Sequence, residues 1–141
     1  MPAAPWPSGS SPRVLLVDDD TALLRVFGPG LERLGFAVTT AESFQEALDR
    51  ASESETTVDV LVADINLQDG WGARLALAIA PLQPSAKVVY ISGHAATDQV
   101  LKDGIEGHMT FLGKPFDIEE LAETIRSVLS GAKREQGSAG G

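Results

Sequence analysis

The sequence predicts an α/β fold: an open, doubly wound sheet of five parallel strands with helices on both faces. Two observations predict it. Five short apolar runs, rich in β-branched residues, are spread over residues 13–130, and amphipathic stretches alternate with them. Near-continuously apolar runs are typical of strands that are buried on both faces of a parallel sheet. Strict alternation of such strands with helices indicates five β-α units, with five strands and five helices.

Each apolar run has the length of a single strand. The expected strands are Arg13–Val17, Phe36–Thr40, Val58–Ala63, Lys87–Ile91 and Met109–Leu112. Ligands of doubly wound sheets bind at the carboxyl ends of the strands, near the switch in strand order. The residues that follow the strands are therefore the first candidates for a functional site.

The first helix should run from about Thr21 to Leu34, but Gly28-Pro29-Gly30 interrupts its pattern. Proline cannot donate a hydrogen bond to the carbonyl one turn back, and glycine weakens a helix interior. We expect a kink or a broken helix here, as a tolerated irregularity rather than a functional hinge.

Start signals mark the later helices. Ser43 and Glu46 have the spacing of a capping box, and Asp117 and Glu120 repeat it before the last helix. The middle helix should stop near two prolines. The aliphatic residues Leu75, Ile79 and Leu82 indicate this helix, and the two prolines are Pro81 and Pro84. The last helix carries an apolar face made of Leu121, Ile125, Val128 and Leu129.

Length and composition fit one domain with short tails. The 141 residues suit a single core, and 43% hydrophobic with 22% charged residues argues against a wholly disordered chain. Residues 1–12 are rich in Pro, Ser and Gly, and residues 131–141 lack apolar periodicity. We therefore expect a disordered leader at 1–12, a domain at 13–130, and a disordered tail or linker at 131–141.

Charge and composition exclude several classes of function. The net charge of −9 opposes direct nucleic-acid binding. The chain has no cysteine, which excludes disulfides, thiolate zinc sites and cysteine nucleophiles. No apolar run approaches the roughly 20 residues of a membrane span, and the first residues lack the layout of a signal peptide. We expect a cytoplasmic protein that works away from membranes.

Chemically complementary residues follow four of the five strands. They are Asp18, Asp19 and Asp20 after the first, Asp64 after the third, Ser92 after the fourth, and Lys114 with Pro115 after the fifth. Taken singly, each has a structural explanation, such as an aspartate that caps the next helix. Because the carboxyl ends of parallel strands share one edge, we expect the four groups to meet, which favours a common chemical role.

These residue types together point to phosphoryl transfer. Clustered carboxylates raise each other's pKa and destabilise the fold unless a cation lies between them. Oxygen ligands without His or Cys favour a hard cation, Mg²⁺ or Mn²⁺, which also binds substrate phosphate. The Ser92 hydroxyl and the Lys114 ammonium would contact phosphoryl oxygens while one carboxylate attacks in line and forms an acyl phosphate.

The segments that carry these residues resemble the motifs of response-regulator receiver domains. The segments are LLVDDD, VADINLQDGWG, VVYISGH and FLGKPF, and the resemblance covers essentially all of 13–130. It implies a flavodoxin-like sheet with strand order 2-1-3-4-5. It also implies a signalling domain that catalyses its own phosphorylation and dephosphorylation, rather than an enzyme in the usual sense.

The resemblance assigns a role to each residue at the strand ends. Asp64 corresponds to the phosphoacceptor, with Ser92 and Lys114 as the groups that act on the phosphoryl oxygens. The proline after this lysine, Pro115, is often cis in the family. The metal ligands of the family correspond to Asp18, Asp19, Asp64 and the backbone carbonyl of Asn66. Within the acidic pair, Asp19 would be the carboxylate that binds the metal directly.

Switching and lifetime residues follow from the same resemblance. Ser92 and Phe111 occupy the switch positions, and a phenylalanine without a hydroxyl makes any aromatic switch steric. Asn66 and His94 occupy the positions that tune the lifetime of the phosphoryl group. Gln68 stands where the family commonly has proline. We expect this departure to loosen the loop after the phosphoacceptor without touching the chemistry.

The resemblance implies a donor and an output. A sensor histidine kinase or a histidine phosphotransfer protein would donate the phosphoryl group, and Asp64 phosphate would draw Ser92 towards it, with Phe111 repacking behind. The face formed by the fourth helix, fifth strand and fifth helix, about residues 97–129, would then contact an output partner. Many receivers dimerise through this face only when phosphorylated, so the oligomeric state stays open.

Two other functions fit part of the pattern. A degenerate receiver would act as a constitutive interaction module, although every key residue type is present here. A haloacid-dehalogenase-type phosphatase would use Asp18 as nucleophile and Asp20 as acid or base. It would leave Asp64 without a role, and no acidic pair follows Lys114 at a later strand end, where this phosphatase would need one. Neither glycine signature of a nucleotide-binding loop follows the first strand.

Overall fold

The computed structural model describes residues 11–53, 55–93 and 110–130. Its strands are β1 (Arg13–Val17), β2 (Ala37–Ala41), β3 (Val60–Asp64), β4 (Asn66–Leu67), β5 (Gly70–Trp71), β6 (Lys87–Ser92) and β7 (Thr110–Gly113). Its helices are α1 (Thr21–Arg33), α2 (Phe44–Ser52), α3 (Gly72–Ile79) and α5 (Ile118–Ser130). The predicted tails at 1–12 and 131–141 lie almost wholly outside the described residues, as does the fourth helix, expected between the fourth and fifth strands.

Five parallel strands form one sheet in the order β2-β1-β3-β6-β7. Counted along the chain, this is the predicted order 2-1-3-4-5. The strand bounds differ from the predicted ones by at most two residues. A second, two-stranded sheet of β4 and β5 follows β3 and was not predicted.

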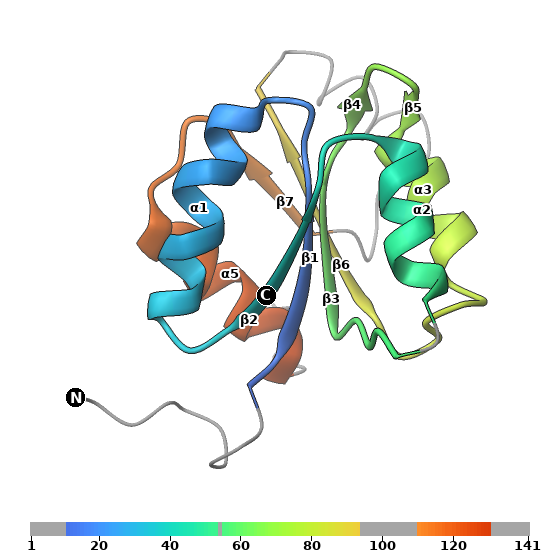
Figure 1. Cartoon of the computed structure of the whole chain (residues 1–141). Helices are drawn as coiled ribbons and strands as arrows, with labels where there is room; N and C mark the ends of the chain where they lie inside the picture. Colours follow the sequence, from blue (N-terminus) through green and yellow to red (C-terminus); the bar gives the residue numbers. More distant parts are fainter. Residues whose placement is uncertain (1–10, 54, 94–109, 131–141) are drawn as a thin grey trace, which may run out of the picture.

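Helices cover both faces of the sheet, with α1 and α5 on one side and α2 and α3 on the other (Figure 1). Alternate strand residues point to opposite faces, so Val14 and Leu16 pack under α1 and α5 while Leu15 and Val17 pack under α2 and α3. This burial on both faces explains why the strands read as continuous apolar runs, and it confirms the doubly wound fold.

Helix α1 is unbroken across Gly28-Pro29-Gly30, so the expected broken helix is wrong, while the alternative of a kink stays a prediction. Gly28 and Gly30 are buried where α1 approaches its neighbours. A Cβ at Gly28 would lie 3.4 Å from Thr40 of β2, and one at Gly30 would lie 3.0 Å from Ile118 of α5. Close packing on the sheet and on α5 therefore holds the helix together despite Pro29.

The predicted helix starts are present, with local corrections. Asp117 and Glu120 exchange both capping hydrogen bonds, the Glu120 amide to Asp117 at 2.8 Å and the Asp117 amide to Glu120 at 3.0 Å. Ser43 accepts from the Glu46 amide, but the Glu46 carboxylate accepts from the residue before Ser43 instead. Helix α3 ends at Ile79, so Leu82 is not part of it and is 43% exposed.

Candidate functional site

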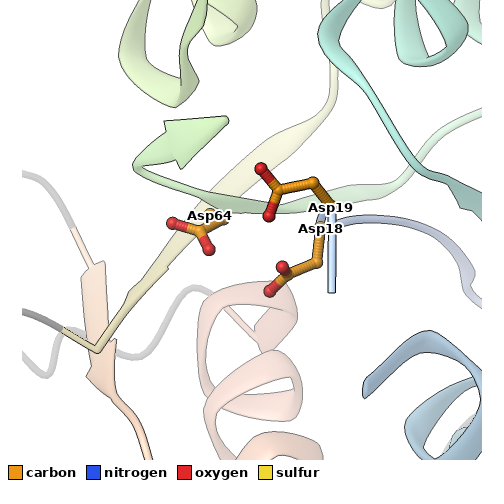
Figure 2. A group of neighbouring side chains, drawn as sticks. All are labelled: Asp18, Asp19 and Asp64. Atoms are coloured by element: carbon orange, nitrogen blue, oxygen red, sulfur yellow. The ribbon is translucent and has the colours of Figure 1, made fainter. Parts of the chain in front are cut away.

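Three carboxylates meet at the carboxyl end of the sheet. Asp18 follows β1 and Asp64 ends β3, and these neighbouring strands pair Val17 with Ala63, so the two aspartates leave the sheet side by side. Together with Asp19, they each offer one carboxylate oxygen within 4.8 Å of the others (Figure 2). Asp18 is 0% exposed and Asp64 is 7% exposed. The sheet topology therefore gathers these three predicted residues into one largely buried acidic group.

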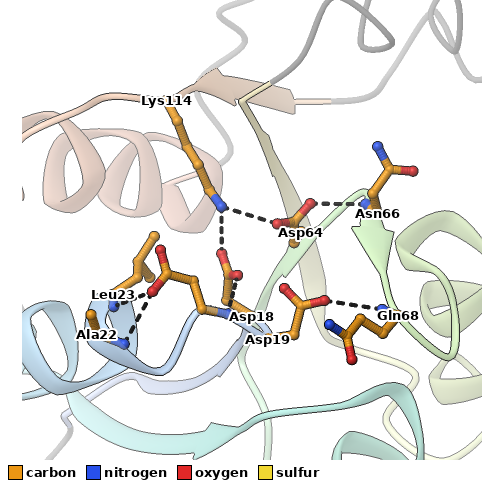
Figure 3. Close-up of polar contacts among 9 residues, drawn as sticks. Asp18, Asp19, Ala22, Leu23, Asp64, Asn66, Gln68 and Lys114 are labelled. Carbon is orange, nitrogen blue, oxygen red and sulfur yellow. Dashed lines mark hydrogen bonds and ion pairs between the residues drawn. The ribbon is translucent and has the colours of Figure 1, made fainter.

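Lys114, just after β7, supplies the positive charge. Its Nζ lies 2.9 Å from Asp18 Oδ2 and 3.0 Å from Asp64 Oδ2 (Figure 3). Its backbone amide donates to the carbonyl of Ser92 at 2.8 Å, which fixes the end of β7 against the end of β6. The peptide bond between Lys114 and Pro115 is cis. One ammonium thus stands between two carboxylates from different strands.

The charges of the site shift the pKa values of its members. Burial raises the pKa of Asp18, and the nearby charge of Asp64 adds to the rise, while Lys114 opposes it. Burial alone would lower the pKa of Lys114, but its contacts with both aspartates outweigh burial and raise that pKa overall. The fully buried Asp18 is therefore harder to ionise than an ordinary aspartate.

Backbone amides hold each carboxylate of the site in place. Asp18 Oδ1 accepts from the amide of Asp20 at 2.8 Å, and Asp64 Oδ1 accepts from the amide of Asn66 at 2.8 Å. Asp19 Oδ2 accepts from the amide of Gln68 at 3.0 Å. The Gln68 amide therefore contacts a site carboxylate directly, and the expectation that Gln68 loosens the loop without touching the chemistry stays a prediction.

Asp20, the third of the consecutive aspartates, has a structural role. Its side chain accepts from the amides of Ala22 and Leu23 and caps α1. This is the helix-capping explanation that the sequence allowed for it. Asp18 and Asp19 point into the site instead, so only two of the three consecutive aspartates belong to it.

The donor set of the site fits a hard cation. All three side-chain donors are carboxylates, as Mg²⁺ and Mn²⁺ prefer. The buried Asp18 Oδ2 has the ammonium of Lys114, at 2.9 Å, as its partner among the described residues. A buried carboxylate oxygen is costly unless a cation lies beside it, and Lys114 fills this role without a metal. The ligand role of the Asn66 carbonyl stays a prediction.

The predicted switch residues lie on β6, which pairs with the strand of Asp64, and on β7, the next strand in the sheet. Ser92 ends β6 and is 4% exposed, and Asp64 pairs with the preceding residue, Ile91. Phe111 lies in β7 and its ring packs against Tyr90 of β6, with ring centroids 5.4 Å apart. Sequence reasoning did not single out Tyr90. His94 lies outside the described residues.

Comparison with known proteins agrees with this geometry. A sequence model of the family described as the response regulator receiver domain matches residues 14–126. The chain belongs to the response-regulator receiver family. Among receivers of known sequence, the two-component response regulator ARR10 of Arabidopsis thaliana is 33% identical over 121 residues, which are 86% of this chain and 22% of that protein. The first curated relatives are longer, and this receiver spans between 20% and 51% of their length.

Solved receiver structures share the fold. A response regulator receiver protein from Sinorhizobium medicae WSM419 is 31% identical with a TM-score of 0.74, over 87% of this chain and 98% of that one. A response regulator protein from Burkholderia pseudomallei, crystallised with a phosphorylated aspartic acid, calcium ion and citrate, is 28% identical with a TM-score of 0.70, over 90% of this chain and 74% of that one.

None of the helices in the described part of this receiver is both long and apolar enough to span a bilayer.

Proposed function

We propose that this receiver accepts a phosphoryl group on Asp64 in a reaction that requires Mg²⁺ or Mn²⁺, and that it acts as a phosphorelay switch in the cytoplasm. The donor is a phosphohistidine of a sensor histidine kinase or of a histidine phosphotransfer protein. The observation that carries the proposal is the position of the Asp64 carboxylate, which shares the ammonium of Lys114 with Asp18 and lies beside both carboxylates of the acidic pair.

A relative supports the choice of chemistry. The Burkholderia pseudomallei regulator holds a phosphorylated aspartic acid together with a calcium ion. In this chain, Asp18 and Asp64 both have Lys114 and two further carboxylates beside them, and Asp64, 7% exposed where Asp18 is 0% exposed, is the one that a phosphodonor can reach. We therefore place the phosphoryl group on Asp64, with the cation held by Asp18, Asp19, Asp64 and the carbonyl of Asn66.

The chain's own residues account for the transfer step. A carboxylate oxygen of Asp64 attacks phosphorus in line, the O–P bond forms, and the N–P bond of the phosphohistidine breaks. The bonding pair returns to the histidine nitrogen, which takes up a proton. Lys114 neutralises charge on the transferred oxygens, and Ser92 donates a hydrogen bond to one of them. The cation, when bound, neutralises further phosphoryl charge and orients the group.

The switch follows from the new charge on Asp64. The phosphoryl group draws the Ser92 hydroxyl towards it, and the space that this leaves is filled by Phe111, whose ring already packs on Tyr90. The change reaches β7, α5 and the segment before them, which form the output face for a protein partner. Phosphorylation-dependent dimerisation would use the same face, and Asn66 and His94 set the rate at which water removes the phosphoryl group.

The proposal is tested by incubating the protein with a small acyl phosphate and Mg²⁺, and then measuring its intact mass. We expect the mass of one phosphoryl group to be added to wild type, and no addition when Mg²⁺ is removed by a chelator. The Asp64→Asn variant should gain nothing, while the exposed-site control Asp49→Asn should behave as wild type. An equal gain in Asp64→Asn would contradict the proposal.

A further inference from the structure

The two-residue turn between β4 and β5, formed by Gln68 and Asp69, joins the acidic site to helix α2. The carboxylate of Asp69 accepts from the first amides of α2, from Phe44 at 2.8 Å and from Gln45 at 3.2 Å. These hydrogen bonds favour the ionised form and lower the pKa of Asp69. The turn is thereby fixed to a helix that lies 24 residues earlier in the chain.

Close packing at Gly70 and Gly72 holds the same hairpin against two neighbouring elements. A Cβ at Gly70 would lie 2.6 Å from the Phe44 ring, and one at Gly72 would lie 2.3 Å from the carbonyl oxygen of Asp64. No side chain fits at either position without displacing its neighbour. The turn is therefore held against α2 on one side and against the end of β3 on the other.

The hairpin directs one hydrogen-bond donor into the acidic site. The backbone amide of Gln68 donates to Asp19 Oδ2 at 3.0 Å (Figure 3). Proline has no amide hydrogen, so the proline that receivers commonly have at this position could not make this bond. The departure at Gln68 thus adds a contact to a carboxylate of the acidic site.

We propose that the Gln68 amide, held in place by Asp69, is a positioning group that fixes the Asp19 carboxylate for cation binding. This inference rests on the proposed role of Asp19 as a metal ligand. A carboxylate with one oxygen hydrogen-bonded keeps a single orientation, and the other oxygen then points to the cation without a loss of rotational freedom on binding. Groups that orient metal ligands in this way commonly change metal affinity by 10- to 100-fold.

Mg²⁺ affinity of the unphosphorylated protein tests the proposal. Trp71 in β5 is 49% exposed, and in a Trp6→Phe background it is the only tryptophan, so its fluorescence reports on the hairpin. Titration with MgCl₂, followed by this fluorescence and by calorimetry, gives the dissociation constant. We expect Gln68→Pro to bind about tenfold more weakly than wild type. Gln68→Ala keeps the amide and should bind as wild type does.

Two further variants separate positioning from folding. In the Gln68→Ala background, replacing the amide at position 68 by an ester removes the N–H without a proline ring, and should weaken binding as Gln68→Pro does. Asp69→Ala leaves the amide but frees the turn, and should also weaken binding. The unfolding free energy of each variant without Mg²⁺ identifies any loss of affinity that is due to misfolding.

The outcomes distinguish this inference from the proposed function. Saturable Mg²⁺ binding by wild type with equal affinity in the ester variant would overturn the inference and leave the proposed function intact. Equally weak binding by Gln68→Ala and Gln68→Pro would overturn it as well, since the side chain and not the amide would then matter. Failure of wild type to bind Mg²⁺ would overturn both.

Discussion

Lys114 Nζ lies 3.0 Å from Asp64 Oδ2, and the same nitrogen lies 2.9 Å from Asp18 Oδ2. One ammonium from the end of β7 therefore offsets the charge of two carboxylates from the ends of β1 and β3. In the absence of a divalent cation, this lysine is the group that keeps the acidic site from destabilising the fold.

Lys114→Met should lower the unfolding free energy in the presence of a chelator by about 2 kcal/mol. This is less than the loss for a fully buried pair, because the lysine side chain is 23% exposed. Saturating Mg²⁺ should stabilise the variant more than wild type, because the cation replaces the missing charge. Urea unfolding with and without Mg²⁺ measures both effects. The exposed Lys87→Met is the control, and a Lys114 variant indistinguishable from it would contradict the argument.

Asp69→Asn should destabilise the protein at neutral pH by about 1 kcal/mol, because one of the two hydrogen bonds to α2 and the negative charge at the helix start are lost. The pKa of Asp69 is lowered from 3.8 in the folded state, so its contribution is complete above that value. The contribution is lost as the pH falls through the lowered pKa.

The difference in unfolding free energy between wild type and Asp69→Asn should therefore be constant from pH 7 to pH 5 and shrink below 3.8. Denaturant unfolding at a series of pH values measures this difference, in which the titration of the other carboxylates cancels. A difference in unfolding free energy that grows at acidic pH would contradict the lowered pKa of Asp69.

Gly28→Ala should stabilise the protein by roughly 0.5–1 kcal/mol, because alanine restricts the unfolded chain and favours the helix. Its Cβ would meet Thr40 at 3.4 Å, which is ordinary contact. Gly30→Ala should gain less or be destabilising, since its Cβ would lie 3.0 Å from Ile118 Cδ1. Chemical denaturation of the two variants measures the contrast, and the opposite order would contradict the packing described for α1.

The sheet and the side chains at its carboxyl edge were predictable from sequence for one physical reason. Strands buried on both faces leave continuous apolar runs, and parallel topology brings the residues after them to one edge. Asp18, Asp64 and Lys114 could therefore be grouped before their contacts were known. The continuity of α1 through Pro29 could not, because it depends on how closely Gly28 and Gly30 approach other elements.

The contacts of the hairpin after β3 could not be predicted from the sequence either. The hydrogen bond from Gln68 to Asp19 uses a backbone amide, which every residue except proline carries, so no particular residue type indicates it in the sequence. Asp69 followed by Gly70 is a turn signal, but its partners in α2 depend on the path of the loop. Tyr90 reads as one more apolar strand residue, and only its packing on Phe111 links it to the proposed switch.

Phosphorylation should change the surroundings of Tyr90. The chain has one tyrosine, so fluorotyrosine gives a single ¹⁹F resonance from a ring that contacts Phe111. If Ser92 and Phe111 carry the switch, the resonance should shift on phosphorylation of wild type and stay in place in phosphorylated Ser92→Ala. Mg²⁺ without a phosphodonor is the control. An equal shift in both proteins would remove Ser92 from the switch.

The position of the phosphoryl group is the most direct test of the function proposed here. Borohydride reduces an acyl phosphate to an alcohol and so converts a phosphorylated aspartate into homoserine, which peptide mass spectrometry locates. After treatment with a phosphohistidine donor and Mg²⁺, we expect homoserine at position 64, and none when Mg²⁺ is withheld. Homoserine at position 18 or 19 with position 64 unchanged would contradict the assignment of Asp64 as the phosphoacceptor.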